Sequence, residues 1–282
     1  MGNGDVIRHL PRVEKDNAGL ALGSLLCGSE GTLGLVTAVR LRLVAPPVPA
    51  ATALVGFSSV ATAVEAAAAL RRPAPGAEAI EFMVDSGVSL VRSVTGLRAP
   101  LAEEYPAYLL VEFGDEEDPV AIASDAVAAL AGARDAAVAT DSVGRHELWR
   151  YREEHTNAVA IAGRAHKFDV TLPLDALAGF VEAITSEVQR VRPEADVWLF
   201  GHAGDGNVHV NVTGISDGDD EVGDVVVSAV LSHHGSISAE HGIGRTKRRW
   251  LHLARSEADL RAMRAIRSAL DPDGVCNPAV AF

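Results

Sequence analysis

Apolar residues recur along the chain at two periods, every second residue in short segments and every third or fourth residue in longer ones. The first period is typical of half-buried strands and the second of amphipathic helices. Strands are predicted over residues 53–57, 79–84, 108–113, 136–140 and 166–173. Helices are predicted over residues 61–70, 119–131, 146–162, 174–191, 221–233 and 256–270, and a turn over residues 73–76. This mixture favours an α+β sandwich over a helical bundle.

The most informative alternation is a predicted hairpin over residues 197–212. Its first strand is an apolar run that ends at His202, and a glycine-rich turn leads into a second, strictly alternating strand. Because successive strand side chains point to opposite faces, Asn207, His209 and Asn211 share one face, with valines behind them. His202 is expected to lie close to this polar row.

A second glycine-rich segment, residues 235–244, carries Glu240 and His241. A single histidine is more often a surface or core residue than a metal ligand. Here, however, His202 and His209 flank one tight turn, and a glutamate is held in another loop. Two imidazoles and a carboxylate form a suitable ligand set for a divalent metal. The sequence therefore predicts a metal site built from these two segments.

The predicted helix over residues 146–162 has mixed faces. Arg152 and Thr156 are four residues apart, so they are expected to lie one turn apart on the same face. The simplest explanation of Arg152 is a solvated charge that pairs with Glu153 or Glu154. A contact with an anionic ligand is the alternative.

The composition limits the classes of function. The chain has 282 residues, enough for about two domains, and a formal net charge of −13. Its longest basic run is Lys247, Arg248 and Arg249, which argues against a nucleic-acid surface. A small anionic substrate would therefore need cations placed locally. Lys167, which shares a predicted strand face with Asp169, is one candidate.

Cysteine usage and hydropathy give the expected compartment. Cys27 and Cys276 are far apart and form no CxxC motif, which argues against a disulfide framework or a thiolate zinc site. The first twenty residues are polar, and no apolar run approaches the ~20 residues of a membrane span. We therefore expect a cytoplasmic protein without a membrane span. No internal repeat is apparent in the sequence.

The N-terminal 45 residues differ from the rest of the chain. A glycine-rich turn over residues 28–34 leads into a strand-like alternation over residues 35–44. Glycines let a backbone approach a phosphate or a flat ring closely, although such a turn is more often only a bulge. So few strands cannot bury a core, and residues 1–45 are predicted to be the C-terminal remnant of a domain. Prolines over residues 45–49 form a linker to a second domain over residues 46–282.

Five longer strings point to a family: KDNAGLALGSLLCGSEGTLGLVT, HKFDVTLP, FGHAGDGNVHVNV, SAEHGIGRTKR and LDPDGVCNP. In this order and at these spacings, the chain resembles the FAD-linked 2-hydroxy acid dehydrogenases and oxidases. That family includes flavin-type D-lactate dehydrogenases, D-2-hydroxyglutarate dehydrogenase and the flavin subunit of glycolate oxidase. The resemblance covers residues 15–278. In the family, a flavin-binding half precedes the segment found here.

The resemblance implies a fold and a set of site residues. The implied fold is a ferredoxin-like α+β cap domain, an antiparallel sheet covered by helices, after the end of an α+β FAD-binding domain. The implied cofactors are FAD and a divalent metal, usually zinc. By resemblance, the metal ligands are His202, His209 and Glu240, the substrate-binding residues are Arg152, Thr156, Lys167 and Asn211, and the catalytic base is His241. The implied FAD contacts are Gly28, Ser29, Glu30, Gly31, Thr32, Gly34 and Asn277.

The implied activity is oxidation of a small D-2-hydroxy acid, such as lactate, glycolate or 2-hydroxyglutarate, to the 2-oxo acid by metal-assisted hydride transfer to flavin. A homo-oligomer and an electron acceptor are expected as well. One alternative is a non-catalytic, truncated or split subunit that needs a separate flavin-binding polypeptide. Another is a metal-dependent hydrolase, because two histidines and a glutamate also activate water.

Overall fold

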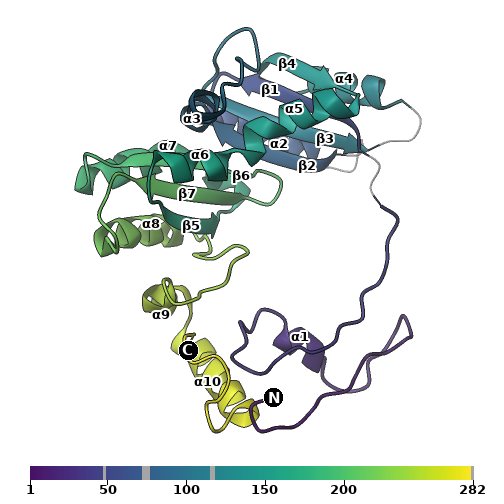
Figure 1. Cartoon of the computed structure of the whole chain (residues 1–282), viewed down its shortest axis with the longest axis vertical. Helices are drawn as coiled ribbons and strands as arrows, with labels where there is room; N and C mark the ends of the chain where they lie inside the picture. Colours follow the sequence, from purple (N-terminus) through teal and green to yellow (C-terminus); the bar gives the residue numbers. More distant parts are fainter. Residues whose placement is uncertain (47–48, 72–76, 115–117, 281–282) are drawn as a thin grey trace. The chain divides into compact units, whose positions relative to one another are not determined.

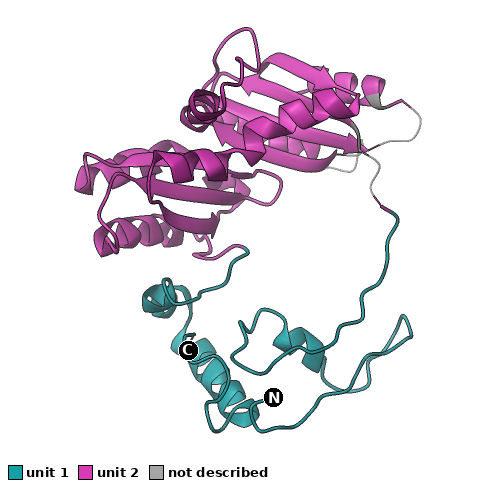
Figure 2. Cartoon of the chain, viewed as in Figure 1, with its two compact units in different colours: residues 1–45, 240–282 teal, residues 46–239 magenta. Residues whose placement is uncertain are grey.

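The structure is a computed structural model that describes residues 1–46, 49–71, 77–114 and 118–280 (Figure 1). The chain divides into two compact units (Figure 2): the sheet unit, residues 46–239, and the terminal unit, residues 1–45 together with 240–282. The division after residue 45 coincides with the predicted linker. Residues 240–282, which the sequence grouped with the sheet, cluster instead with the N-terminal segment. The predicted turn at 73–76 lies outside the described residues.

The sheet unit contains one seven-stranded sheet in which all neighbouring strands are antiparallel, in the order β4-β1-β3-β2-β6-β7-β5. Its strands are β1 (Pro49–Phe57), β2 (Ala77–Val84), β3 (Ala107–Gly114), β4 (Ala133–Ala139), β5 (His166–Thr171), β6 (Asp196–His202) and β7 (Asn207–Thr213). The α+β fold expected from the sequence is confirmed, and each predicted strand of this unit is present.

The sheet consists of two halves with the same topology. In the first half, β1, α2 (Val60–Leu70), β2, β3, α4 (Pro119–Ala128) and β4 follow the ferredoxin-like order 4-1-3-2. In the second, β5, α7 (Leu174–Val191), β6, β7 and α8 (Asp220–Ser232) repeat it, and a bridge from Ser236 to Thr171 takes the place of the fourth strand. This structural repeat is absent from the sequence pattern, because the two halves share topology rather than residues.

Helices cover both faces of the sheet (Figure 1). On one face α2 packs against α7, and α7 packs against α8. On the other, α3 (Asp85–Thr95) packs against α5 (Ser142–Glu153) and α6 (His155–Ala162). This second layer covers a buried cluster that includes Leu54, Met83, Val88, Tyr151 and Phe200. The site described below lies on the same face.

Several sequence predictions need correction. The helix predicted over 146–162 is two helices, because Glu154 interrupts it between α5 and α6. The helix α3 was not predicted, because it follows β2 without any intervening turn signal. Residues 35–44 form no strand. Their alternating apolar side chains are exposed, Leu41 at 76% and Leu43 at 90%.

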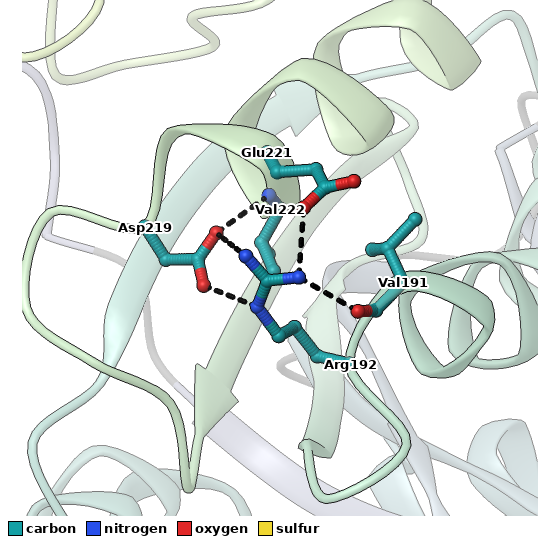
Figure 3. A network of polar contacts seen from close by, with 5 residues as sticks. All are labelled: Val191, Arg192, Asp219, Glu221 and Val222. Atoms are coloured by element: carbon teal, nitrogen blue, oxygen red, sulfur yellow. Dashed lines mark hydrogen bonds and ion pairs between the residues drawn. The ribbon is translucent and has the colours of Figure 1, made fainter.

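A polar network fixes the end of α7 to the start of α8 (Figure 3). The Arg192 guanidinium donates to both oxygens of Asp219, at 2.5 and 3.2 Å, and to Glu221 at 2.7 Å. Asp219 also caps α8 by accepting from the Val222 amide at 3.2 Å. The Arg192 guanidinium also donates to the Val191 carbonyl at 2.7 Å. The network thereby holds the two helices that back the second half of the sheet.

The terminal unit is mostly irregular. Its helices are α1 (Leu22–Leu26), the 3₁₀ turn η1 (Arg248–Trp250), α9 (Leu251–Ala254) and α10 (Glu257–Leu270). The helix α10, predicted over 256–270, begins at a capping box formed by Ser256 and Asp259. Among the described helices of both units, none is long and apolar enough to cross a membrane.

Candidate active site

One face of the strands β2, β6, β7 and β5 carries polar side chains, and we call it the polar face. The register places them in adjacent cross-strand rows, because side chains of directly paired residues point to the same side. The first row is Glu81, His202, Asn207 and Thr171, and the second is Met83, Phe200, His209 and Asp169. The hairpin expected from the sequence is therefore present, and β2 and β5 extend its polar side.

The two histidines of the hairpin lie side by side. The ring centroids of His202 and His209 are 5.6 Å apart, and the rings are nearly perpendicular. His202 Nδ1 lies 2.8 Å from Glu81 Oε1, and His209 Nδ1 lies 3.6 Å from Asp169 Oδ1. Each imidazole therefore has a carboxylate next to the same ring nitrogen. A carboxylate at Nδ1 favours the tautomer that directs the Nε2 lone pair away from it.

The turn of the hairpin requires glycine at one position. Gly206 has a φ of +80°, and a Cβ there would collide with the Leu172 carbonyl oxygen. Next to it, Asn207 donates from its side chain to Asp169 Oδ1 at 2.7 Å. The buried amide thus ties the start of β7 to β5 and holds the carboxylate that faces His209.

Arg152 belongs to this site rather than to solvent. The simple expectation that it pairs with Glu153 or Glu154 is wrong, because its Nε donates to Glu81 Oε2 at 2.6 Å. The guanidinium carbon also lies 4.8 Å from the centre of the Phe200 ring. The buried Glu81 carboxylate and the Phe200 ring therefore fix the position of the Arg152 charge.

A buried histidine completes the layer above the polar face. His155 is 1% exposed, and its ring centroid lies 4.8 Å from that of Phe200. Neither of its ring nitrogens makes a hydrogen bond of good geometry to the described residues. Burial and the nearby Arg152 charge lower the pKa of His155 to about 3. The ring is therefore neutral at physiological pH.

The other predicted substrate-binding residues are distributed around this point. Lys167 is exposed and pairs in register with Asn211, one row beyond His209 on the polar face. The Asn211 side chain is almost buried, 5% exposed. Thr156 is exposed on α6. The structure therefore brings Lys167 and Asn211 onto the face that holds the histidines.

Glu240 and His241 lie in the terminal unit, whereas His202 and His209 lie in the sheet unit. The Glu240 carboxylate is 3.6 Å from His241 Nε2, and both side chains are more than half exposed. Within the described part of the chain, no cluster of three or more His, Cys, Asp or Glu residues has the geometry to hold a metal ion. The three-residue metal site therefore stays a prediction.

The predicted FAD contacts are also in the terminal unit, where several bind one another. The Glu30 carboxylate accepts from the amides of Ile243 and Gly244, at 2.8 and 2.7 Å. The Glu30 carbonyl accepts from the Asn277 side chain at 2.7 Å. Glu30 thus joins the N-terminal segment to the loop that follows His241 and to the C-terminal segment, across more than 200 residues.

The other predicted FAD-binding residues could contact a cofactor mainly through their backbone groups. Thr32 is fully buried, and its hydroxyl donates to the Ser29 carbonyl at 2.7 Å. Gly28 and Gly31 have φ angles of +76° and +73°, which only glycine adopts readily. Gly34 packs against Met1. An FAD role for these seven residues stays a prediction.

The sequence analysis missed two residues of the site, Glu81 and His155, and it gave Asn207 and Asp169 no role. Glu81 and His155 lie within apolar or mixed segments, and their partners are distant in sequence. One signal was present for Glu81, which is a charge between Ile80 and Phe82 in the strand predicted over 79–84. A charge at such a position needs a partner, since a buried unpaired carboxylate is costly.

Comparison with known proteins decides the family. Residues 47–280 match the family described as FAD linked oxidases, C-terminal domain. The chain belongs to this family. It is 34% identical to the D-2-hydroxyglutarate dehydrogenase of Xanthomonas citri pv. viticola, over 100% of the chain and 61% of that protein. It is 32% identical to the mitochondrial D-2-hydroxyglutarate dehydrogenase of Bos taurus, over 99% of the chain and 52% of that protein.

The FAD-linked oxidase chain therefore spans about half to three fifths of the length of these curated relatives. Among solved structures, alkyldihydroxyacetonephosphate synthase matches 94% of the chain with a TM-score of 0.59, and the match covers 50% of that protein. The 4-ethylphenol oxidase of Gulosibacter chungangensis matches 84% of the chain and 54% of its own length, also with a TM-score of 0.59. Both are 14% identical to the chain, so they show a shared fold alone.

Proposed function

We propose that this chain forms the substrate- and metal-binding part of an FAD-dependent dehydrogenase that oxidises a small D-2-hydroxy acid to the 2-oxo acid. The observation that carries the proposal is the pair of histidines backed by carboxylates on the polar face, next to Arg152. The relatives named D-2-hydroxyglutarate dehydrogenase make that acid the first substrate to test. Family membership favours this activity over a metal-dependent hydrolase.

The donor set suits a divalent metal such as zinc. Histidine ligands of metals commonly donate their second ring N–H to a carboxylate, which fixes the ring and makes it a better ligand. His202 and Glu81 have this arrangement at 2.8 Å, and Asp169 lies near the same ring nitrogen of His209, at 3.6 Å. Glu240 is the proposed third ligand. A metal held there would supply a Lewis acid that lowers the pKa of the substrate hydroxyl.

Two cations on this chain suit an acidic substrate. The Nε edge of Arg152 faces Glu81, and the edge formed by its two terminal nitrogens is suited to a bidentate contact with a carboxylate. Lys167 offers a second, exposed charge on the same sheet face. Asn211 and Thr156 would add hydrogen bonds. A dicarboxylate can pair with both Arg152 and Lys167. Because the chain has a net charge of −13, an anionic substrate needs such cations close to its binding site.

Proton and hydride need separate acceptors. We assign the hydroxyl proton to His241, because imidazole is an effective base near neutral pH. FAD, when bound, supplies the hydride acceptor, and residues 28–34 with Asn277 would provide this chain's contacts to it. Cytoplasmic location, a homo-oligomer and an electron acceptor remain part of the proposal.

Residues 28–34 and Asn277 would bind FAD together with an FAD-binding half, either of the same polypeptide or of a separate one. The exposed apolar residues of 35–44, such as Leu35 at 83% and Leu43 at 90%, favour a partner that covers this segment. If the partner is separate, this chain alone would remain colourless with added FAD and would bind the cofactor only with the second polypeptide present. A yellow, active protein from this chain alone would contradict the split-subunit alternative.

The metal assignment has a direct test. Elemental analysis of the purified chain should find one zinc per chain, and His209→Ala should lose it. His146→Ala changes an exposed histidine of α5 and is the matched control. In the enzyme completed with its FAD-binding half, D-2-hydroxyglutarate should reduce the flavin under anaerobic conditions, and Arg152→Lys should raise KM. Full zinc retention in His209→Ala, or no flavin reduction by any 2-hydroxy acid, would contradict the proposal.

A further inference from the structure

Glu81 connects two residues that the proposed function uses. Its side chain is 8% exposed and lies on β2, where the two halves of the sheet meet. One carboxylate oxygen lies 2.8 Å from His202 Nδ1, and the other accepts from Arg152 Nε at 2.6 Å. These partners are 121 and 71 residues away in the sequence. A single buried carboxylate therefore sets the positions of an imidazole and a guanidinium.

The geometry leaves Glu81 little freedom. Each oxygen has its own nitrogen partner, so rotating the carboxylate would break two charge-assisted hydrogen bonds. The backbone around it is also fixed, because β2 pairs with β6 through Glu81–His202, Phe82–Gly201 and Met83–Phe200. A carboxylate this buried would be costly without partners. The arrangement is therefore a rigid support for both side chains.

This support has a chemical consequence for His202. The Nδ1 atom must carry a proton to donate to a carboxylate, so the lone pair lies on Nε2. In free imidazole side chains the opposite tautomer is the more common one. Glu81 therefore selects the form of His202 whose Nε2 can bind a metal.

The consequence for Arg152 is orientation. Glu81 holds the Nε side of the guanidinium, and the Phe200 ring lies 4.8 Å from its central carbon. Together these two contacts hold the guanidinium in place. The terminal nitrogens are thereby directed away from Glu81, as a bidentate contact with a substrate carboxylate requires.

We propose that Glu81 is a positioning residue that fixes the His202 tautomer and the Arg152 fork together, and so couples metal binding to substrate binding. The proposal rests on the proposed function for the roles of His202 and Arg152. Asp169 is the equivalent support for His209, but it is weaker, because its distance to Nδ1 is 3.6 Å and the same oxygen accepts from Asn207. Glu81 should therefore have the larger effect.

The test uses the intact chain without metal or FAD. Nitrogen-15 NMR of the imidazole rings at pH 8 reports which ring nitrogen carries the proton, with His202→Gln used to assign the signals. We expect His202 to be protonated at Nδ1 in the wild type. In Glu81→Gln the amide can satisfy Arg152 with its oxygen and turn its NH₂ toward His202, so the proton should move to Nε2.

Zinc titration of the same proteins gives the second readout. Loss of a carboxylate of this kind weakens metal binding by about 10–100-fold, so Glu81→Gln should show a decrease of that size. Glu112→Gln is the matched control, since Glu112 lies on β3 and accepts from Trp149 Nε1 at 2.8 Å. It should change neither the His202 tautomer nor the zinc affinity. The Nε–H signal of Arg152 should shift only in Glu81→Gln.

The outcomes separate the two proposals. A wild-type His202 protonated at Nε2 would overturn the role of Glu81, whatever the chain binds, and this measurement does not depend on the folding of Glu81→Gln. An unchanged tautomer and an unchanged zinc affinity in Glu81→Gln would overturn it as well. A chain with the expected tautomer that binds no zinc would instead overturn the metal site and leave the positioning of His202 and Arg152 by Glu81 supported.

Discussion

The buried His155 should make the protein sensitive to mild acid. Burial, and then the charge of Arg152, lower its pKa to about 3 in the folded state, against 6.5 in an unfolded chain. Because the folded pKa is depressed, the unfolded state takes up a proton first as the pH falls. The stability that the neutral ring contributes is therefore present above pH 6.5 and is lost progressively between pH 6.5 and 3.

The size of the effect follows from the same linkage. Each pH unit below the unfolded pKa costs about 1.4 kcal/mol until the folded pKa is reached. From pH 8 to pH 5 this one group should therefore lower the free energy of unfolding by about 2 kcal/mol. Whole domains are stable by only about 5–15 kcal/mol, so the loss is a large fraction of the total.

Urea unfolding of wild type and His155→Leu at pH 8 and pH 5, followed by circular dichroism, would measure it. Leucine is uncharged and of similar size, so the variant should lose about 2 kcal/mol less than wild type between the two pH values. His146→Leu is the control, because that exposed histidine of α5 should leave the pH dependence unchanged. Equal pH dependence in wild type and His155→Leu would refute the assignment of a buried neutral ring.

Three further predictions follow from contacts in the two units. Gly87→Ala places a Cβ 2.6 Å from His155 Nε2 and should lower the free energy of unfolding by about 1–3 kcal/mol. In Gly179→Ala, on α7, the added Cβ meets no atom within 4 Å, so this variant should raise the free energy of unfolding by up to about 1 kcal/mol. Equal urea midpoints for the two variants would contradict this. Arg192→Ala removes the network between α7 and α8, so its melting temperature should fall by several degrees, and an unchanged value would show that the network contributes nothing. Glu30→Gln weakens the hydrogen bonds from the Ile243 and Gly244 amides to this side chain, so the hydrogens of both amides should exchange with solvent at least about tenfold faster. Unaltered exchange would argue against a stabilising role for these hydrogen bonds.

Local patterns in the sequence were enough to predict much of the sheet unit. The helix α7 coincides with its predicted residues, and the hairpin of β6 and β7 forms as the alternation and the glycine turn require. The helix α10 was also predicted, and its capping box involves two side chains only three residues apart, Ser256 and Asp259. These features depend on interactions within a few residues, so the amino-acid order specifies them directly. The proximity of His202 to His209 belongs with them, because one tight turn joins their strands.

Only the tertiary structure placed the partners of these residues. Glu81 reaches Arg152 and His202 because β2 pairs with β6, a strand more than 100 residues later, and no local pattern specifies that pairing. The same limit applied to the contact between the His155 and Phe200 rings. It also applied to Glu30, which contacts amides 213 and 214 residues away. The failure of residues 35–44 to form a strand has a related cause, since alternation predicts a strand only where a neighbouring strand can pair with it. The amino-acid order thus determined which side chains were available for chemistry, and the packing of distant segments decided which of them support one another.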